Sequence, residues 1–450
     1  KPFLYALALA PSQASPWTAA TPILDVTTTF LDDAGTPYTP RNYDGREHGP
    51  VPLRVALGSS LNIPAVITLD HVGIGRVIDL AGQVGIASLG RQDEYNLSLA
   101  LGGGEMSLLE LTAAYATFAN EGHYPGSIQI LDITDFDGNL LYETDPPVQA
   151  QVFDPRLAWL ISDILSDDAA RTLTFGPNSI LRLDRTAAVK TGTTSNFHDN
   201  WTIGYTPELV VGVWAGNAGY EPMRNVTGLT GAAPIWAEAM RTLLQGRPDR
   251  PFVRPDGLVQ VDVCDLSGLL PTRDCAHVRS EWFIEGTEPT DFDTVYHIIF
   301  LDSATGDLAS TLTPTERIYP LTVHDLPTAA VPWAREMGLP LYADYIQLEA
   351  ATQAEPILLL QPRPNTTYRL VDTFDRESQR LLVEAVAGQP VVELTLWVDD
   401  AILATFTAPP YRAWWPLAPG GHRFRAEAVL ADGSRIVSET ATITVNYEEP

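Results

Sequence analysis

Apolar residues recur every three or four positions in several segments, which is the spacing of one face of an α-helix. Ser107 stands where a helix cap is expected and Pro155 where a first helical turn is expected, and serine and proline favour these two positions. We therefore predict four helices and one interrupted helical stretch in the first 250 residues. The helical segments are residues 3–10, 108–120, 154–167 and 232–245, and glycines interrupt the pattern over 67–89.

Short apolar runs bounded by turn residues predict strands between these helices. Residues 128–143 alternate around Asp137-Gly138, a pair typical of a hairpin turn. A strand around Lys190 and runs at 201–205 and 209–215 are expected to form an antiparallel meander, which the last helix can cover. The expected fold class is multidomain α+β, with a first domain over residues 1–250 that combines an antiparallel sheet with helices.

The pattern changes near residue 355, where strand-like runs follow one another without helices between them. Several short strands with turn signals predict an immunoglobulin-like β-sandwich over residues 355–450. This part has no cluster of nucleophile, base and anion-binding residues, so we expect it to act as a binding module or a spacer rather than as a catalytic domain. The runs are residues 357–360, 381–386, 391–398, 401–406, 421–430 and 436–445, with turns at Asp399-Asp400 and Asp432-Gly433.

Residues 251–354 connect these two parts and hold both cysteines, Cys264 and Cys275. Two cysteines that close a short loop favour a disulfide in an oxidising compartment. Two free thiols, or a zinc site that includes His277, are the alternatives, although the fourth ligand and the paired short spacing typical of zinc are missing. We expect the disulfide, and no metal or other cofactor.

The charge of the chain restricts its partners. The 450 residues carry a formal net charge of −28, which argues against nucleic acid because phosphate binding requires basic surface. No apolar run approaches the ~18 residues of a membrane-spanning helix. The chain opens on an apolar helical pattern at Lys1 without an initiator Met or a signal peptide. We therefore expect a piece of a longer protein, attached to a membrane only through an anchor upstream.

Lysine is rare here, since Lys1 and Lys190 are the only two in the chain. A lysine amine is compact and has a tunable pKa, whereas a guanidinium stays charged. The stretch Lys190-Thr191-Gly192-Thr193 offers an ammonium and hydroxyls to an anion, and its glycine leaves room for a ligand backbone. Ser60-Leu61-Asn62 offers a hydroxyl and an amide between two helical patterns. Taken singly, the Lys-Thr-Gly stretch is typical of a strand end with a turn glycine, and the Ser-x-Asn triplet is typical of a helix cap.

Together these residues resemble a known family. A lysine in an apolar helix, then Ser-x-Asn, then Lys-Thr-Gly is the pattern of penicillin-recognising serine enzymes. The phrases at 38–45, 60–66, 113–120 and 212–217 are similar to the transpeptidase domain of class A bifunctional penicillin-binding proteins. The opening residues, the cysteine loop and the terminal sandwich resemble the 1C type of that class. The resemblance covers essentially the whole chain and implies a penicillin-binding-protein/serine β-lactamase-like fold.

The resemblance implies acyl transfer on peptidoglycan stem peptides that end in D-Ala-D-Ala, binding of β-lactams, and a location on the extracytoplasmic face of a bacterial membrane. The serine nucleophile would lie three residues before Lys1, with a glycosyltransferase domain and an anchor further upstream, so the chain as given is not expected to form an acyl-enzyme. Lys1 is the expected general base. Ser60 is expected to relay a proton between Lys1, Lys190 and the leaving amine.

The resemblance also assigns substrate-binding residues. Asn62 is expected to hold an amide of the substrate, and Lys190, Thr191 and Thr193 its terminal carboxylate, while Gly192 lets the peptide lie along the strand. The Thr193 N–H is expected to supply half of an oxyanion hole. His198 and Asp199 follow closely, but such a pair is more typical of a surface loop. If other envelope or cell-wall synthesis proteins bind, we expect them at the C-terminal domain.

Two further functions stay open at this point. A D,D-carboxypeptidase or a β-lactamase-like hydrolase would share these residues and would need a carboxylate that activates water, for which Glu105 and Glu110 are candidates. A non-catalytic cell-wall-binding protein also fits a chain without the nucleophile. The residues upstream of Lys1 discriminate between the enzymatic and the non-catalytic alternative.

Overall fold

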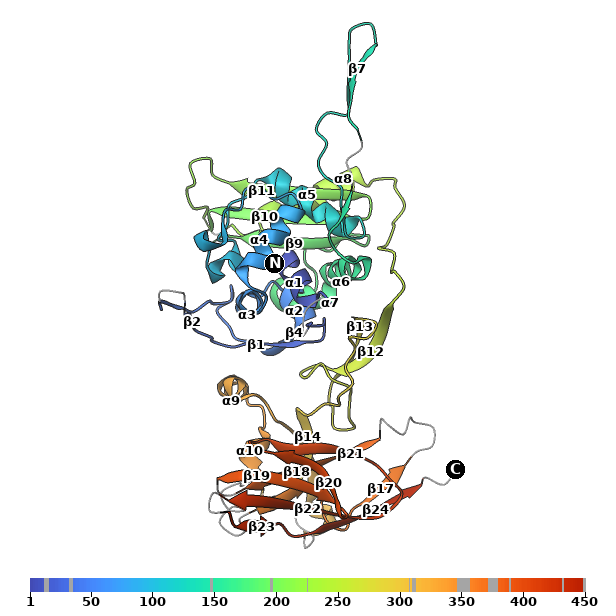
Figure 1. Cartoon of the computed structure of the whole chain (residues 1–450). Helices are drawn as coiled ribbons and strands as arrows, with labels where there is room; N and C mark the ends of the chain where they lie inside the picture. Colours follow the sequence, from blue (N-terminus) through green and yellow to red (C-terminus); the bar gives the residue numbers. More distant parts are fainter. Residues whose placement is uncertain are drawn as a thin grey trace. The chain divides into compact units, whose positions relative to one another are not determined.

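The computed structural model describes the chain except residues 12–15, 32–34, 146–148, 195–196, 225, 307, 310–312, 346–356, 371–378, 388–389, 431–432 and 448–450. Its contacts divide the chain into two compact units, Lys1–Leu341 and Tyr342–Pro450 (Figure 1). The boundaries expected near residues 250 and 354 remain predictions.

Most helices before the sheet pack around one apolar core. Helix α1 (Pro2–Leu9) is apolar on all sides and is therefore central, with Tyr5, Ala6 and Ala8 fully buried. The predicted cap at Ser107 and first-turn position of Pro155 are confirmed, because Ser107 forms a capping box with Glu110 and Pro155 begins α6, where Asp154 adds a cap that was not predicted. The other helices are α2 (Leu53–Gly58), α3 (Ile63–Val72), α4 (Ile74–Gln83), α5 (Leu108–Ala119), α6 (Pro155–Ser166) and α7 (Asp168–Phe175).

The predicted meander is confirmed as a three-stranded antiparallel sheet. Strands β9 (Ala188–Thr193), β10 (Asp199–Thr206) and β11 (Leu209–Gly216) lie in the order β11-β10-β9. Helix α8 (Ala232–Leu243) covers one face, and α5 lies against the other (Figure 1). Within the sheet that the described residues form, β9 is therefore an edge strand, with one side open to a ligand backbone.

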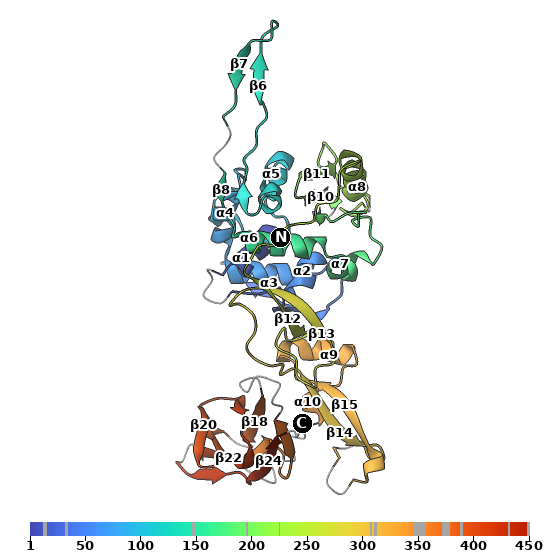
Figure 2. The ribbon, with the colours of Figure 1, turned by 90° about the vertical axis from the view of Figure 1, so that its right-hand side faces the viewer.

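The predicted hairpin is formed by β6 (Asp132–Thr134) and β7 (Leu140–Glu143). It stands away from the helices of its unit in both views (Figure 1, Figure 2). Leu131 and Leu141 are 69% and 67% exposed, and Phe136 at the tip is fully exposed. Among the described residues, this ribbon buries little of its own apolar surface.

Short strands complete the region before α8. Strand β1 (Pro22–Asp25) pairs with β4 (Gly49–Pro52), which leads directly into α2. The remaining short elements are β2 (Phe30–Leu31), β3 (Pro37–Tyr38), β5 (His123–Tyr124), β8 (Ala150–Gln151) and the 3₁₀ turns Gln92–Glu94 and Leu97–Leu101.

Two antiparallel strand pairs follow α8. The first pair is β12 (Leu258–Cys264) with β13 (Val278–Ile284), and the second is β14 (Tyr296–Asp302) with β15 (Ile318–His324). A disulfide joins Cys264 to Cys275, whose Cα atoms are 6.1 Å apart. The remaining elements of the first unit are α9 (Val331–Glu336) and the 3₁₀ turns Thr315–Arg317 and Thr328–Ala330, and α10 (Tyr342–Tyr345) begins the second unit.

The second unit is a β-sandwich, as predicted. One sheet has the order β16-β18-β21, the other β17-β24-β22-β19-β20 with β23 beside β22, and both contribute to one core. Two strands were not predicted, and residues 436–445 divide between two strands; Asp432 of the expected turn lies outside the described residues. The strands are β16 (Ile357–Gln361), β17 (Thr367–Leu370), β18 (Arg380–Ala387), β19 (Val391–Val398), β20 (Ala401–Phe406), β21 (Tyr411–Pro416), β22 (Gly420–Leu430), β23 (Arg435–Val437) and β24 (Ala441–Tyr447).

In the described part of the chain, every helix is too short or too polar to cross a bilayer.

Candidate active site

A cleft of about 860 Å³ in the first unit is lined by all of the predicted catalytic and substrate-binding residues. They come from the start of α1, from the turn between α2 and α3, and from the edge strand β9, so segments more than a hundred residues apart meet there. The predicted residues that line it are Lys1, Ser60, Asn62, Lys190, Thr191, Gly192 and Thr193.

Ser60 sits in the turn between α2 and α3 with a positive φ of 61°. A left-handed backbone costs a non-glycine residue about 1–2 kcal/mol, and such conformations persist where the surrounding structure fixes them, often at functional sites. Here the neighbouring Ser59 donates its hydroxyl to the Ala170 carbonyl at 2.8 Å. The start of α7 thereby holds the turn in place.

Lys190 reaches this turn from β9. Its Nζ donates to Ser60 Oγ at 2.5 Å and to the Thr191 carbonyl at 2.7 Å, and the residue is 7% exposed. Burial, and then the positive charge of Arg171, lower the pKa of Lys190 to about 7. Near neutral pH this amine can therefore either give or take a proton.

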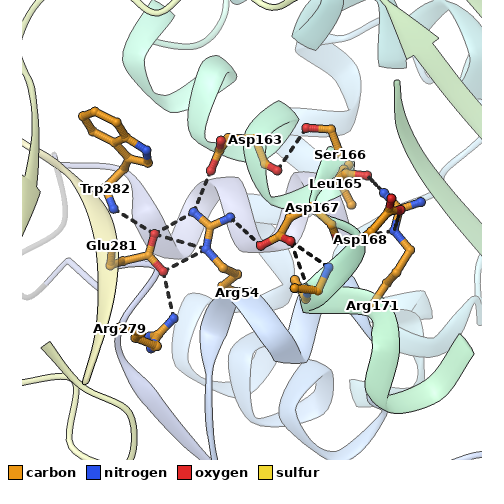
Figure 3. Close-up of polar contacts among 12 residues, drawn as sticks. Arg54, Asp163, Leu165, Ser166, Asp167, Asp168, Arg171, Arg279, Glu281 and Trp282 are labelled. Atoms are coloured by element: carbon orange, nitrogen blue, oxygen red, sulfur yellow. Dashed lines mark hydrogen bonds and ion pairs between the residues drawn. The ribbon is translucent and has the colours of Figure 1, made fainter. Parts of the chain in front are cut away.

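Arg171 on α7 is 3% exposed and binds the Leu165 carbonyl at 2.6 Å, with Asp168 3.6 Å away (Figure 3). It was not predicted from the sequence. Arginines are scattered along the chain, and no spacing marks this one as the cation that acts on Lys190.

Arg54 on α2 forms a second buried hub beside it (Figure 3). Its Nη2 binds Glu281 of β13 and Asp163 of α6, both at 2.6 Å, and its Nη1 lies 3.3 Å from Asp167. Burial has the largest single effect and would raise the pKa of Glu281, but the hydrogen bonds from Arg54, the charges of Arg54 and Arg279, and the Trp282 N–H together outweigh it, and the pKa is lowered. Arg54 thus connects α2, the helix before Ser60, to β13, a strand that follows β9, β10 and β11 in the sequence.

Lys1 contacts the same turn. Its Nζ donates to the carbonyls of Ser60 at 2.8 Å and Leu61 at 3.0 Å, and to Asn62 Oδ1 at 2.7 Å. These three acceptors match the three donors of an ammonium. Burial and the charge of Lys190 lower the pKa of Lys1 well below its ordinary value, whereas Asp25 opposes them. Neutral Lys1 must leave one of these acceptors without a donor.

The amide of Asn62 is oriented by its neighbours. Its Oδ1 accepts from Lys1, and its Nδ2 donates to the Arg41 carbonyl at 2.9 Å. Because an amide carries two N–H groups, one stays available for a ligand. On β9, Thr193 Oγ1 accepts the Gly228 N–H at 2.9 Å, and its own proton can still be donated.

The two neighbours of the Lys-Thr-Gly stretch differ in position. Asp199 lines the cleft and accepts the Trp214 Nε1–H at 2.9 Å. His198 lies against Tyr220, with ring centroids 4.3 Å apart and its Nδ1 donating to the Tyr220 carbonyl at 2.8 Å. The structure thus places His198 as part of an exposed stacked pair.

The cleft also has walls that the sequence did not point to. Tyr43 and Tyr220, each 65% exposed, and Trp214 line its mouth. Tyr43 and Trp214 lie in two of the phrases that resemble the family, at residues 38–45 and 212–217, whereas Tyr220 lies in none of them. The deeper apolar lining includes Leu89, Leu99, Leu101, Met106 and Leu111.

The two candidate carboxylates have different surroundings. Glu110 accepts hydrogen bonds from Ser88 at 2.6 Å and from Ser107 at the start of α5, contacts that lower its pKa. It is therefore occupied as a helix cap. Glu105 lines the cleft.

Two family models match this chain. The model described as "Penicillin binding protein transpeptidase domain" matches residues 23–240. The model described as "Penicillin-binding protein 1A, C-terminal domain" matches residues 254–298, which hold β12, β13 and the disulfide.

Similar proteins carry related names. "Penicillin-binding protein 1A" of Aquifex aeolicus is 34% identical over 259 residues, 57% of this chain and 34% of that protein. "Penicillin-binding protein 2D" of Bacillus subtilis is 34% identical over 298 residues, 65% of this chain and 42% of that protein. The crystal structure of penicillin-binding protein 1A from Haemophilus influenzae is similar with a TM-score of 0.56 at 28% identity, over 65% of this chain and 48% of that one. The chain thus spans less than half the length of these relatives.

Proposed function

Residues 23–240 are a penicillin-binding protein transpeptidase domain, and from that premise we propose that this chain is the acyl-transfer region of a peptidoglycan cross-linking D,D-transpeptidase. The observation that carries the proposal is the convergence of Lys190 and Lys1 on the turn that bears Ser60. The predicted fold and family are thereby confirmed. The relatives named above are of the 1A and 2D types, so the 1C subtype stays a prediction.

The proposed reaction begins with attack of a serine Oγ on the carbonyl between the two terminal D-Ala residues. The serine O–C bond forms, the C–N bond to the last D-Ala breaks, and the serine proton ends on the leaving amine. We place the serine three residues before Lys1. Lys1 takes its proton, and Ser60 passes a proton toward the amine with Lys190 as its partner. Attack of a second stem-peptide amine on the ester then forms the cross-link and frees the serine.

Substrate binding is proposed on β9. Lys190, Thr191 and Thr193 would hold the terminal carboxylate, because a charged donor and two hydroxyls line one wall of the cleft. The peptide would lie along the open edge of β9 at Gly192, with the free N–H of Asn62 on its other side. The N–H of Thr193 would stabilise the developing oxyanion, a contribution of about 3 kcal/mol per donor.

Location and partners follow from the same proposal. The substrate lies outside the cytoplasm, and the disulfide between Cys264 and Cys275 fits an oxidising compartment. We propose the extracytoplasmic face of a bacterial membrane, with stem peptides and β-lactams as ligands. A glycosyltransferase domain and an anchor upstream of Lys1, and protein partners of the C-terminal sandwich, are proposed on the family resemblance alone.

The hydrolytic alternative rests on Glu105. A D,D-carboxypeptidase or β-lactamase must activate water against the acyl-enzyme, and Glu105 is a carboxylate in the wall of the cleft. If Glu105 does this, the acyl-enzyme will be short-lived, and Glu105→Gln will prolong it.

The test is labelling with a fluorescent penicillin. The chain is extended upstream by its own encoded residues through the expected serine, called the extended chain below. We expect one stable adduct on that serine by peptide mass, and none after serine is replaced by alanine. Rapid loss of the label would favour the hydrolase. Absence of any adduct on the folded extended chain would contradict acyl transfer and leave the non-catalytic alternative.

A further inference from the structure

A buried carboxylate lies behind the Ser60 turn. Asp25, at the end of β1, is fully buried, and its two oxygens accept from Asn42 Nδ2 at 2.8 and 2.7 Å. His48 Nδ1 lies 2.5 Å from Asp25, and His48 Nε2 lies 3.1 Å from Asp44. The hydrogen bond to Asp25 raises the pKa of His48. Asn42 Nδ2, His48 Nδ1 and the His48 N–H at 3.2 Å thus supply the hydrogen-bond partners that a buried carboxylate requires.

Asn42 connects this carboxylate to the turn. Its Oδ1 accepts the N–H of Asn62 at 2.8 Å and of Ile63 at 3.4 Å. These groups stand at the start of α3, where backbone N–H groups lack partners within the helix. Asn62 occupies the cap position, but its own side chain makes no capping bond. Asn42, twenty residues away, therefore acts as the cap of α3.

The Asp25 carboxylate and the Arg46 carbonyl, which accepts from Asn42 Nδ2 at 2.9 Å, together fix which way the Asn42 amide faces. Carboxylate and carbonyl oxygens accept hydrogen bonds, so both require the nitrogen of Asn42, and its oxygen then faces α3. Because Asn42 caps the helix, the Asn62 side chain is free for other contacts. It binds Lys1 through Oδ1 and the carbonyl of Arg41, the residue next to Asn42, through Nδ2.

We propose that Asn42 and Asp25 are positioning residues for Lys1 and Asn62, with Asp25 orienting Asn42, Asn42 capping α3, and the freed Asn62 amide holding the lysine. The catalytic meaning of this inference rests on the proposed function, but the geometry concerns Lys1 whether or not a serine is present. Asn42 belongs to the phrase at residues 38–45, for which the sequence supplied a resemblance and no role.

The two lysines make the test direct. Lysine labelled with ¹³C at Cε gives two signals in the folded chain, and Lys190→Arg assigns them, because Lys1 and Lys190 are the only lysines. Two charges act on Lys1: Lys190 disfavours its ammonium, and Asp25 favours it. His48 contacts Asp25 through Nδ1 and Asp44 through Nε2. We compare the pH titrations of the parent, Asp25→Asn and Asn42→Ser.

In Asp25→Asn, the anion that favours the Lys1 ammonium is gone, so we expect Lys1 to titrate at least about half a pH unit lower, with a smaller change at Lys190. Asn42→Ser, which keeps a short hydroxyl in place of the amide, should shift the Lys1 signal in the same spectra. Asp302→Asn is the matched control. Asp302, like Asp25, is a buried carboxylate, but it lies on β14 and its partner is Arg317.

Lys1 titrating as in the parent in both folded variants would overturn the proposal, as would an equal change in Asp302→Asn. If Asp25→Asn does not fold, Asn42→Ser alone decides. In the extended chain, Asp25→Asn should also move the acid limb of the acylation rate to lower pH, which a merely structural role would not do. The lysine titration requires no acylation, so a failed penicillin assay and a failed positioning network remain distinguishable.

Discussion

Lys190 Nζ donates to Ser60 Oγ at 2.5 Å across 130 positions of sequence. One partner lies on an edge strand and the other in a left-handed turn between helices, so the contact joins the sheet to the helical core at the cleft. Because the lysine is buried, its pKa of about 7 lies far below the ordinary 10.5. That difference makes the stability of the fold depend on pH.

The first prediction concerns this dependence. Below pH 7, Lys190 is charged in both folded and unfolded chains, and burying the charge costs stability. Between pH 7 and 10.5 the unfolded chain binds the proton and the folded chain does not, so its contribution to the free energy of unfolding rises with pH. The free energy of unfolding of Lys190→Met, minus that of the parent, should therefore be larger at pH 6 than at pH 10 by roughly 1–4 kcal/mol. Urea denaturation of both proteins at the two pH values measures this difference.

Lys190→Arg is the matched control. A guanidinium stays charged across this range, so this variant should lose the pH dependence like Lys190→Met but remain less stable at high pH. Parallel stability curves for the parent and Lys190→Met from pH 6 to 10 would show that the lysine is not desolvated as described.

The second prediction concerns the hub of Arg54 and Glu281 (Figure 3). Glu281 is fully buried and is held by Arg54 and by Arg279 Nη1 at 3.0 Å, so removing Arg54 leaves the buried charge with one cation in place of two. Arg54→Met should lower the free energy of unfolding by about 3–5 kcal/mol. The double variant Arg54→Met/Glu281→Leu should cost less than the sum of the single changes, because the buried charge is then gone as well.

Arg91→Met is the control for this cycle, since the Arg91–Asp93 pair is 81% and 68% exposed. An exposed pair contributes below about 1 kcal/mol. Additive effects of the Arg54 and Glu281 substitutions would contradict the hub.

The sequence predicted those residues of the site that belong to short motifs. Lys190, Ser60 and Asn62 stand in motifs whose chemistry is local, and periodicity predicted the helices and the sheet that bring them together. Arg54 and Glu281 could not be paired in advance, because they lie 227 positions apart and no spacing relates them. The role of Asn42 and Asp25 could not be predicted either, because it depends on which atom of the Asn42 amide faces which partner.

Several elements were missed. Helix α7 follows α6 after a single residue, Asp167, whose side chain caps it, and it has only 8 residues, so it is short for a helical pattern to be recognised. Strands β12 to β15 were not predicted, although Val259, Val261 and Val263 of β12 alternate with polar Gln260 and Asp262, the pattern of a strand with one exposed face. The pairing of β12 with β13 and of β14 with β15 is a tertiary contact that local preference does not specify.

The third prediction concerns the disulfide. Its loop spans 11 positions, and closing a loop of that length stabilises the fold by about 2–4 kcal/mol. The double variant Cys264→Ala/Cys275→Ala should lose that amount, and reduced parent should match it. Intact mass after alkylation of the exported, unreduced protein should show no modified thiol. Two alkylated cysteines in that sample would contradict the pairing.

The fourth prediction is that residues 342–450 fold alone, because they form a compact unit with a core of their own. The isolated segment should unfold in one cooperative transition. Leu396→Ala, at a fully buried position, should cost about 2–5 kcal/mol, and Ile402→Ala, 60% exposed, below about 0.5 kcal/mol. A gradual, non-cooperative transition would show that the unit depends on the rest of the chain.

The last prediction separates the roles of the two lysines in the extended chain. Lys1→Arg keeps the positive charge but removes the amine that can become neutral, so proton abstraction from the serine should fail while carboxylate binding persists. Lys190→Arg brings a bulky fork into a space where the lysine is 7% exposed and already bonded to Ser60. It should weaken both binding and acylation.

The measurement is the rate of acylation by a fluorescent penicillin as a function of its concentration, which gives the apparent affinity and the limiting rate separately. Lys1→Arg should lower mainly the limiting rate, and Lys190→Arg both quantities. Arg91→Lys is the control, since Arg91 is exposed and outside the cleft. If Lys1 merely precedes a helix and Lys190 merely ends a strand, both arginine variants will react almost like the parent. A loss below about tenfold, roughly 1.4 kcal/mol, at both positions would therefore refute the catalytic assignment while leaving the fold intact.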